Sequence, residues 1–276
     1  KSKTAVAIEI EAINDEYEDI DEAVYQIPRG WNNAYDGSIS SSMGREFIML
    51  PEVGDAALNQ VKTFCSWLTR KGWYTDSSCG IHVHTDAFYL GVNELKGILL
   101  TARALEPLIY NMLPKSRSES RYSKPMETID SQVILDVKSV SDLCQLWYEA
   151  MNGTHASSEK YNDSRYRGFN LHSRFLHGTI EYRYHHGTIS DYYINNWILF
   201  CLAISDFGTT LLSKDKKAVN LFVEAGDGSV DKYPDLLEAM GISNLIPYIE
   251  EMVDRSSSAP NEINGEVANW RSAQSM

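Results

Sequence analysis

The 276-residue sequence predicts an α+β fold built on a mostly antiparallel sheet. Short segments rich in β-branched and aromatic residues are interspersed with longer segments whose apolar residues recur at helical spacing. These segments do not follow the regular strand–helix order of a doubly wound protein. In three of the expected strands, one residue separates two polar ones, which places both polar side chains on one face of a sheet.

The expected strands are short and mostly apolar. The opening segment TAVAIEIEA (residues 4–12) is almost wholly apolar up to Ile8, which favours a central strand. The run EFIML (residues 46–50) ends at Pro51, which cannot donate to a sheet ladder. Residues 167–184 predict a hairpin that turns around His177 and Gly178. In chain order, the expected strands are residues 4–12, 46–50, 73–74, 81–85, 169–171 and 179–184.

The expected helices carry apolar residues three or four positions apart. Residues 55–71 show this spacing, and Gly72 supplies a C-terminal stop. Asn93 is a suitable N-cap for the next helix, which Pro114 ends. In chain order, the expected helices are residues 55–71, 93–113, 139–150, 190–212, 234–240 and 244–253.

Length and composition favour one elaborated domain over two. With 43% hydrophobic and 11% aromatic residues, the chain has enough apolar surface for a large core. The longest apolar run, residues 197–204, is much shorter than the roughly 20 residues that a membrane span needs. The net charge of −13 argues against a general nucleic-acid binder. We therefore expect neither a membrane nor a nucleic acid as partner.

The four cysteines lie far apart and form no CxxC pair, so we expect no disulfide framework and no structural zinc site. No secretory segment is visible, and we expect a cytoplasmic protein. Despite the acidic balance, four arginines crowd into one region and leave room for a local basic pocket. They are Arg165, Arg167, Arg174 and Arg183.

Three polar pairs stand two residues apart on an apolar background: Glu9 with Glu11, His82 with His84, and Glu181 with Arg183. If all three segments belong to one sheet, a single face collects carboxylates, imidazoles and a guanidinium. Such a face is costly to bury unless a cation and an anion occupy it. A divalent metal with a phosphate ligand meets that requirement.

Each pair alone has a plainer interpretation. An acidic strand edge explains the glutamates, an exposed strand explains the histidines, and a cross-strand salt bridge explains Glu181 with Arg183. Glu46, read in isolation, is a surface residue. The coincidence of several such features in one chain favours a carboxylate-rich metal site.

A series of motifs in chain order resembles the amidoligase family, a branch of the glutamine synthetase-like carboxylate–amine ligases common in bacteria and phages. The resemblance covers about residues 4–212 and leaves the C-terminal 60 residues outside. HxH and TIExR are its most specific elements. The motifs are IEIE (8–11), DGS (36–38), EFI (46–48), CGIHVH (79–84), RGFNL (167–171) and GTIEYR (178–183).

The resemblance implies a curved, mostly antiparallel sheet of the glutamine synthetase-like catalytic fold, with helices on its outer face. Residues 1–212 would form the catalytic domain, and residues 213–276 a helical extension packed on it. Two or more Mg²⁺ or Mn²⁺ ions would lie between the sheet and ATP. The γ-phosphoryl group would pass to a substrate carboxylate, and an amine would attack the acyl phosphate to form an amide.

The family also implies roles for individual residues. One metal would be held by Glu9, His82 and Glu181, and a second by Glu11 and Glu46. His84 would contact a phosphate. Arg167, or less directly Arg165, would stabilise the transferring phosphoryl group, and Arg183 would face the carboxylate or phosphate. Asp36 and Ser38 would line the substrate end, where Asp36 would help to deprotonate the amine.

The sequence departs from the family pattern at Ala7, where glycine is common, and at Leu50–Pro51, where Ser-Pro is common. Neither change removes a metal ligand. By alternation His185 shares the face of Glu181, four residues earlier on the strand, which would make it a further contact of the site; a packed or a solvated histidine is an equally open interpretation. Residues 115–130, which include Arg117 and Arg121, are expected to form a loop over a cleft.

Two other functions remain open at this point. A metal-dependent amide hydrolase would use similar ligands to activate water, although no HExxH helix is visible. A non-catalytic binding protein would keep the fold alone. The substrates of a ligase, such as an amino acid, a peptide or a protein side chain, are not fixed by the sequence, and neither is the oligomeric state.

Overall fold

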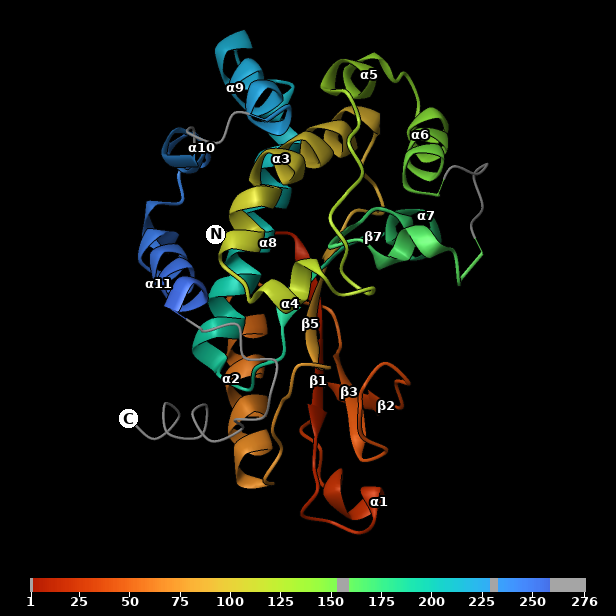
Figure 1. Cartoon of the computed structure of the whole chain (residues 1–276), viewed down its shortest axis with the longest axis vertical. Coiled ribbons are helices and arrows are strands. Elements are labelled where there is room, and N and C mark those ends of the chain that lie inside the picture. Colours follow the sequence, from red (N-terminus) through yellow and green to blue (C-terminus); the bar gives the residue numbers. More distant parts are fainter. Residues whose placement is uncertain (1, 153–158, 229–232, 259–276) are drawn as a thin grey trace.

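An open antiparallel sheet forms the centre of the computed structural model, which describes residues 2–152, 159–228 and 233–258 (Figure 1). The described strands run in the order β2-β3-β1-β5-β7-β6, and β4 pairs with β1. The α+β class and the antiparallel sheet are thus confirmed. The strands are β1 (Ala5–Ile13), β2 (Trp31–Ala34), β3 (Gly44–Met49), β4 (Glu52–Val53), β5 (Gly80–Asp86), β6 (Phe169–Asn170) and β7 (Thr179–His186).

Strand β1 lies in the middle of the sheet, between β3 and β5. Its residues Val6, Ile8 and Ile10 are fully buried and face the hydrophobic core. Because side chains alternate along a strand, Glu9 and Glu11 project from the opposite face. The central position that its apolar sequence predicts is confirmed.

Helices cover the core face of the sheet, where α2, α3 and α8 lie along one side of the strands (Figure 1). Ser205 of α8 fixes the contact, since its hydroxyl lies 2.8 Å from both Thr85 Oγ1 of β5 and Tyr182 OH of β7. The helices are α1 (Ile20–Ala23), α2 (Asp55–Arg70), α3 (Val92–Asn111), α4 (Lys115–Ser118), α5 (Ser131–Asp136), α6 (Val140–Asn152), α7 (His172–His177), α8 (Asp191–Leu211), α9 (Lys216–Gly226), α10 (Tyr233–Met240) and α11 (Ile246–Ser258).

Helices α3 and α8 approach each other closely at a pair of glycines. A Cβ atom on Gly97 would lie 2.1 Å from the carbonyl oxygen of Gly208, and one on Gly208 would lie 2.5 Å from the Cα of Ile98. Only glycine permits this backbone-to-backbone contact. The pair therefore sets the distance between the two longest helices behind the sheet.

The hydrophobic core continues from the sheet into the C-terminal helices. Phe222 of α9, Leu236 of α10 and Tyr248 of α11 belong to the same buried cluster as the apolar residues of β1. One core therefore includes side chains from both sides of residue 212. The division of the chain at that residue stays a prediction. In the described part of the chain, none of the helices combines the length and the hydropathy that a bilayer-spanning segment requires.

Several local expectations are corrected. The N-cap of α3 is Gly91 rather than Asn93, which lies within the first turn. The expected hairpin between β6 and β7 contains α7, which ends at Gly178 in the left-handed conformation (φ 80°). Strands β2 and β4 and helix α5 are too short to show a periodic pattern of their own, and packing against the rest of the chain accounts for them. Helix α9 is not among the expected helices, although its apolar residues recur at helical spacing.

Candidate metal and phosphate site

The sheet register brings the predicted polar residues onto one face. In antiparallel pairs, Glu9 lies opposite His82, Glu11 opposite Glu46, and His84 opposite Glu181. Directly opposite residues of an antiparallel pair share a face, so β3, β1, β5 and β7 all contribute to one polar surface. We call this surface, made by the six residues just named, the polar face.

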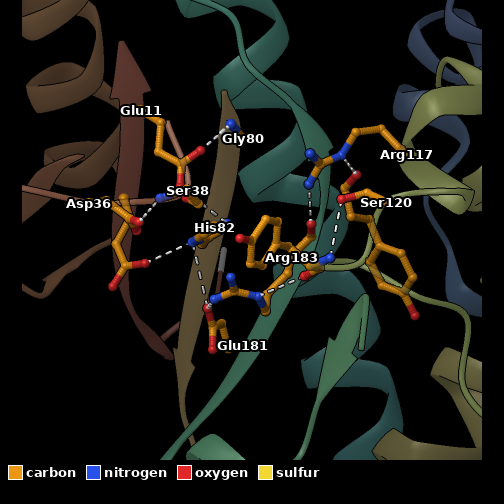
Figure 2. Close-up of polar contacts among 12 residues, drawn as sticks. Glu11, Asp36, Ser38, Gly80, His82, Arg117, Ser120, Glu181 and Arg183 are labelled. Carbon is orange, nitrogen blue, oxygen red and sulfur yellow. Dashed lines mark hydrogen bonds and ion pairs between the residues drawn. The ribbon is translucent and has the colours of Figure 1, made fainter. Parts of the chain in front are cut away.

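Short contacts connect the imidazoles to the carboxylates. His82 Nδ1 lies 2.9 Å from Glu9 Oε2 and 3.7 Å from Glu181 Oε1, as Figure 2 shows for Glu181. His84 Nε2 lies 3.3 Å from Glu9 Oε1 and 3.7 Å from Glu181 Oε1. Although it is buried, this nitrogen makes no hydrogen bond within the described residues. His84 Nε2 is therefore buried beside two carboxylates, in a position to ligate a metal ion that binds between them.

Three groups on this face have ligand atoms within 4.8 Å of one another: Glu9 with Glu46 and His82, Glu9 with His84 and Glu181, and Glu11 with Asp36 and Glu46. Carboxylate oxygens with an occasional imidazole suit Mg²⁺ or Mn²⁺, so the donor set fits the implied ions. The grouping differs from the expected one, because His84 joins Glu9 and Glu181 and because Asp36 joins Glu11 and Glu46. Metal binding itself stays a prediction.

The pKa values of Glu46 and Glu11 show how closely the carboxylates of the polar face crowd one another. Burial, followed by the negative charges of Glu9, Asp36 and Glu11, raises the pKa of Glu46 to about 9. Burial likewise raises the pKa of Glu11, against the effect of His82. Carboxylates that crowd in this way cannot all ionise unless a cation lies among them. A divalent ion would supply that charge.

Glu181 is held by two side chains at once. Asn170 of β6 donates to its Oε2 at 2.6 Å, and Arg183 donates to its Oε1. Although burial favours the neutral acid, the adjacent Arg183 guanidinium holds the pKa of Glu181 below its ordinary value. Sequence reasoning gave no role to Asn170; the signal was its place in the RGFNL motif, between an arginine and an apolar residue.

Arg183 shares the face of Glu181, because it stands two residues further along β7, and a bulge interrupts the strand at this point. The pairs Val83–Tyr182 and Ile81–His185 leave one residue more on β7 than on β5. Arg117 of α4 then donates from Nε to the carbonyl of Tyr184 at 3.0 Å and from Nη2 to that of Arg183 at 2.8 Å (Figure 2). A buried arginine therefore satisfies two consecutive carbonyls at the bulge.

The same bulge removes His185 from the face of Glu181 and makes it a packed histidine, which the sequence left open. With one extra residue in the strand, His185 lies opposite the core residue Ile81 instead of on the face of Glu181. It is fully buried, and its ring lies 5.3 Å from that of Trp197 in α8. Burial lowers the pKa of His185 to about 4, which fits a neutral core histidine.

A cavity of about 230 Å³ opens at the Glu11 and Arg183 end of the polar face. Segment 115–130 borders it as expected, although α4 forms at the start of that segment. The predicted substrate residue Ser38 lies in its wall, and Ser38 N donates to Asp36 Oδ1 at 2.7 Å. The lining residues are Glu11, Ser38, Ser77, Ser78, His82, Arg117, Ser120, Arg121, Tyr122 and Arg183.

The structure does not bring Arg167 or Arg165 into contact with the polar face. Arg167 donates to the carbonyls of Pro125 and Met151 and to Glu127 Oε1 at 2.8 Å. Arg165 donates to the carbonyl of Lys160 at 3.2 Å. Their expected role at a transferring phosphoryl group stays a prediction, which this geometry does not favour.

A protein-family model matches most of the chain. The family model described as "Putative amidoligase enzyme" matches residues 14–205. That span includes every residue of the polar face except Glu9 and Glu11, which lie just before it. No curated protein matches the chain.

Proposed function

Since the chain belongs to the amidoligase family, we propose that it is an ATP-dependent carboxylate–amine ligase. The γ-phosphoryl group of ATP would be transferred to a substrate carboxylate, which releases ADP. An amine would then displace phosphate from the acyl phosphate and form an amide or peptide-like bond. The glutamine synthetase-like fold that the family resemblance implies is part of this proposal.

The observation that carries the proposal is the position of Arg183 between the acidic groups and the cavity. On one side its guanidinium contacts Glu181, and on the other it lines the cavity together with Glu11 (Figure 2). Phosphoryl transfer to a carboxylate brings two anions together, and it needs cations at that junction. A fixed guanidinium beside a candidate metal site provides them.

The residues of this chain then have separate tasks. Glu9, His84 and Glu181 would hold one ion, and Glu11 and Glu46 a second, beside Asp36. Those ions, Mg²⁺ or Mn²⁺, would neutralise phosphate charge when bound.

The remaining groups position the acceptor. Arg183 would orient the acceptor carboxylate with its bidentate fork. Asp36 would accept a proton from the incoming ammonium, and Ser38 would hydrogen-bond the acceptor within the cavity.

The proposal is tested by ADP release in the presence of Mg²⁺ and pooled carboxylates and amines. We expect ADP only when both kinds of substrate are present. Glu11→Gln removes a charged ligand, and Arg183→Ala removes the cation at the junction. Each is expected to lower ADP formation at least about 100-fold, because such electrostatic contacts contribute most of the rate.

Glu18→Gln is the matched control, since Glu18 is exposed and lies outside the strands that form the polar face. It should leave the rate unchanged, and all three variants should keep the wild-type circular dichroism. Amide cleavage without nucleotide would instead identify a hydrolase. A binding protein would do neither reaction.

A further inference from the structure

A second and larger cavity, of about 660 Å³, adjoins the candidate site. Arg121 lines both cavities. Tyr122 of the smaller cavity also contacts Tyr166 of the larger one, with the ring centroids 5.5 Å apart. The larger cavity is lined by Arg121, Lys124, Met151, Tyr161, Asn162, Asp163, Tyr166 and Arg167.

The charge of this cavity is opposite to that of the whole protein. The chain has a net charge of −13, yet Asp163 is the single acidic residue among the lining residues, against three basic ones. Glu127 neutralises Arg167 at 2.8 Å. Within the described ranges, neither Arg121 nor Lys124 forms an ion pair. Two exposed cations are therefore available to an anionic ligand.

The tyrosines of the cavity hold cations in place. The guanidinium of Arg165 lies 5.7 Å from the ring centre of Tyr161 and 5.2 Å from that of Tyr166. Lys160 lies 5.5 Å from the ring of Tyr161 as well. Arg165 and Lys160 thus add positive charge beside the cavity. The arrangement favours a ligand with several anionic groups.

We propose that the larger cavity binds an acidic polypeptide segment, one carboxylate of which enters the smaller cavity as the acceptor. Arg121 and Lys124 would select such a substrate through its neighbouring carboxylates. This inference rests on the proposed ligase function and names its acceptor class. It also accounts for the collection of basic residues in an acidic protein, since a local field of opposite sign attracts the ligand.

The test measures the affinity of fluorescein-labelled hexaglutamate by anisotropy, with labelled hexaglutamine as the uncharged probe. The variant Arg121→Gln/Lys124→Gln should bind hexaglutamate at least about tenfold more weakly than the wild type, whereas hexaglutamine should bind to neither. The matched control is Lys62→Gln/Arg70→Gln, which removes two exposed charges on α2. It should change the affinity less than about twofold if the effect is local.

A second arm measures binding of Mg²⁺ with a non-hydrolysable ATP analogue to the same variants. Loss of nucleotide affinity in Arg121→Gln/Lys124→Gln, with unchanged peptide affinity, would assign the cavity to the nucleotide and overturn the inference. Absence of hexaglutamate binding to the wild type would overturn it too. If Glu11→Gln abolishes ADP formation while Arg121→Gln/Lys124→Gln leaves the hexaglutamate affinity unchanged, the ligase proposal stands and this inference fails.

Discussion

Three carboxylates of the polar face differ in the contacts that surround them. Glu11 accepts a backbone hydrogen bond from Gly80 N at 2.6 Å. Glu181 accepts from the Asn170 amide and the Arg183 guanidinium. Glu46 has mainly carboxylates around it, and its pKa rises to about 9. The need for a cation is therefore greatest at the Glu46 end of the polar face.

Another buried acid, Glu106 of α3, lies behind the sheet. It accepts from Tyr184 OH at 2.8 Å and from Met126 N at 3.0 Å. Burial nevertheless raises its pKa to about 7, against the effect of these two hydrogen bonds. Glu106 thus connects the bulged strand to the segment that carries Arg121.

The pH dependence of stability follows from this pKa. The folded protein retains the Glu106 proton between about pH 4.5 and 7, while the unfolded chain loses it, so this group lowers stability as the pH rises through that range. The effect is roughly 3 kcal/mol at most, from about 1.4 kcal/mol per pKa unit. Glu106→Gln should flatten this part of the urea-unfolding profile; an unchanged slope would contradict the assignment.

At the scale of elements, the β7 bulge and α4 form one unit. Without the extra residue, the alternation of β7 would bring His185 to the polar face and away from the core. Arg117 stabilises the bulge because its two donors replace hydrogen bonds that the sheet ladder cannot supply there.

Arg117→Met tests this unit. Two buried carbonyls would lose their donor, and we expect a loss of about 3 kcal/mol in the free energy of unfolding, together with a strong decrease in ADP formation. Arg117→Lys keeps one donor and should recover part of the stability. Equal denaturation midpoints for wild type and Arg117→Met would contradict the role given to Arg117.

The contact between α3 and α8 gives a second prediction at this scale. Gly97→Ala places a Cβ against the carbonyl of Gly208 and should destabilise the protein by about 3 kcal/mol, measured by thermal unfolding. Gly226→Ala is the control. Its Cβ would have no neighbour closer than 3.6 Å, so the change should stay within about 1 kcal/mol.

At the scale of the whole molecule, the polar face couples stability to divalent cations. An ion that binds only the folded state stabilises it by mass action, by about 1.4 kcal/mol at ten times its Kd. For a chain of this size we expect Mn²⁺ to raise the Tm by roughly 3 °C, and EDTA to reverse the shift. Glu9 and Glu46 each belong to two of the three ligand groups, so Glu9→Gln and Glu46→Gln should reduce the shift most.

The matched control for this prediction is Glu18→Gln, which should retain the full Mn²⁺ shift. An equal shift in Glu9→Gln would mean that the ion binds elsewhere.

Much of the fold could be predicted because its signals are local. The alternation of β1, the helical spacing of α2 and the long apolar pattern of α8 each lie within one segment. Helix α7 was missed because only six residues, enclosed by two strands, form it. Strand β2 was missed as well, since it depends on pairing with β3 rather than on its own pattern.

The sequence by itself determined that the two members of each polar pair lie on one side of their strand, because residues two apart on a strand must share a side. It also placed the chain in its family through the order of its motifs. Only the tertiary structure decided that His84 joins His82 beside Glu9 and Glu181, that His185 turns to the core, and that Arg167 lines a separate cavity. The physical reason is that strand register, a one-residue bulge and contacts between distant segments fix these positions, and none of them is encoded in a local pattern.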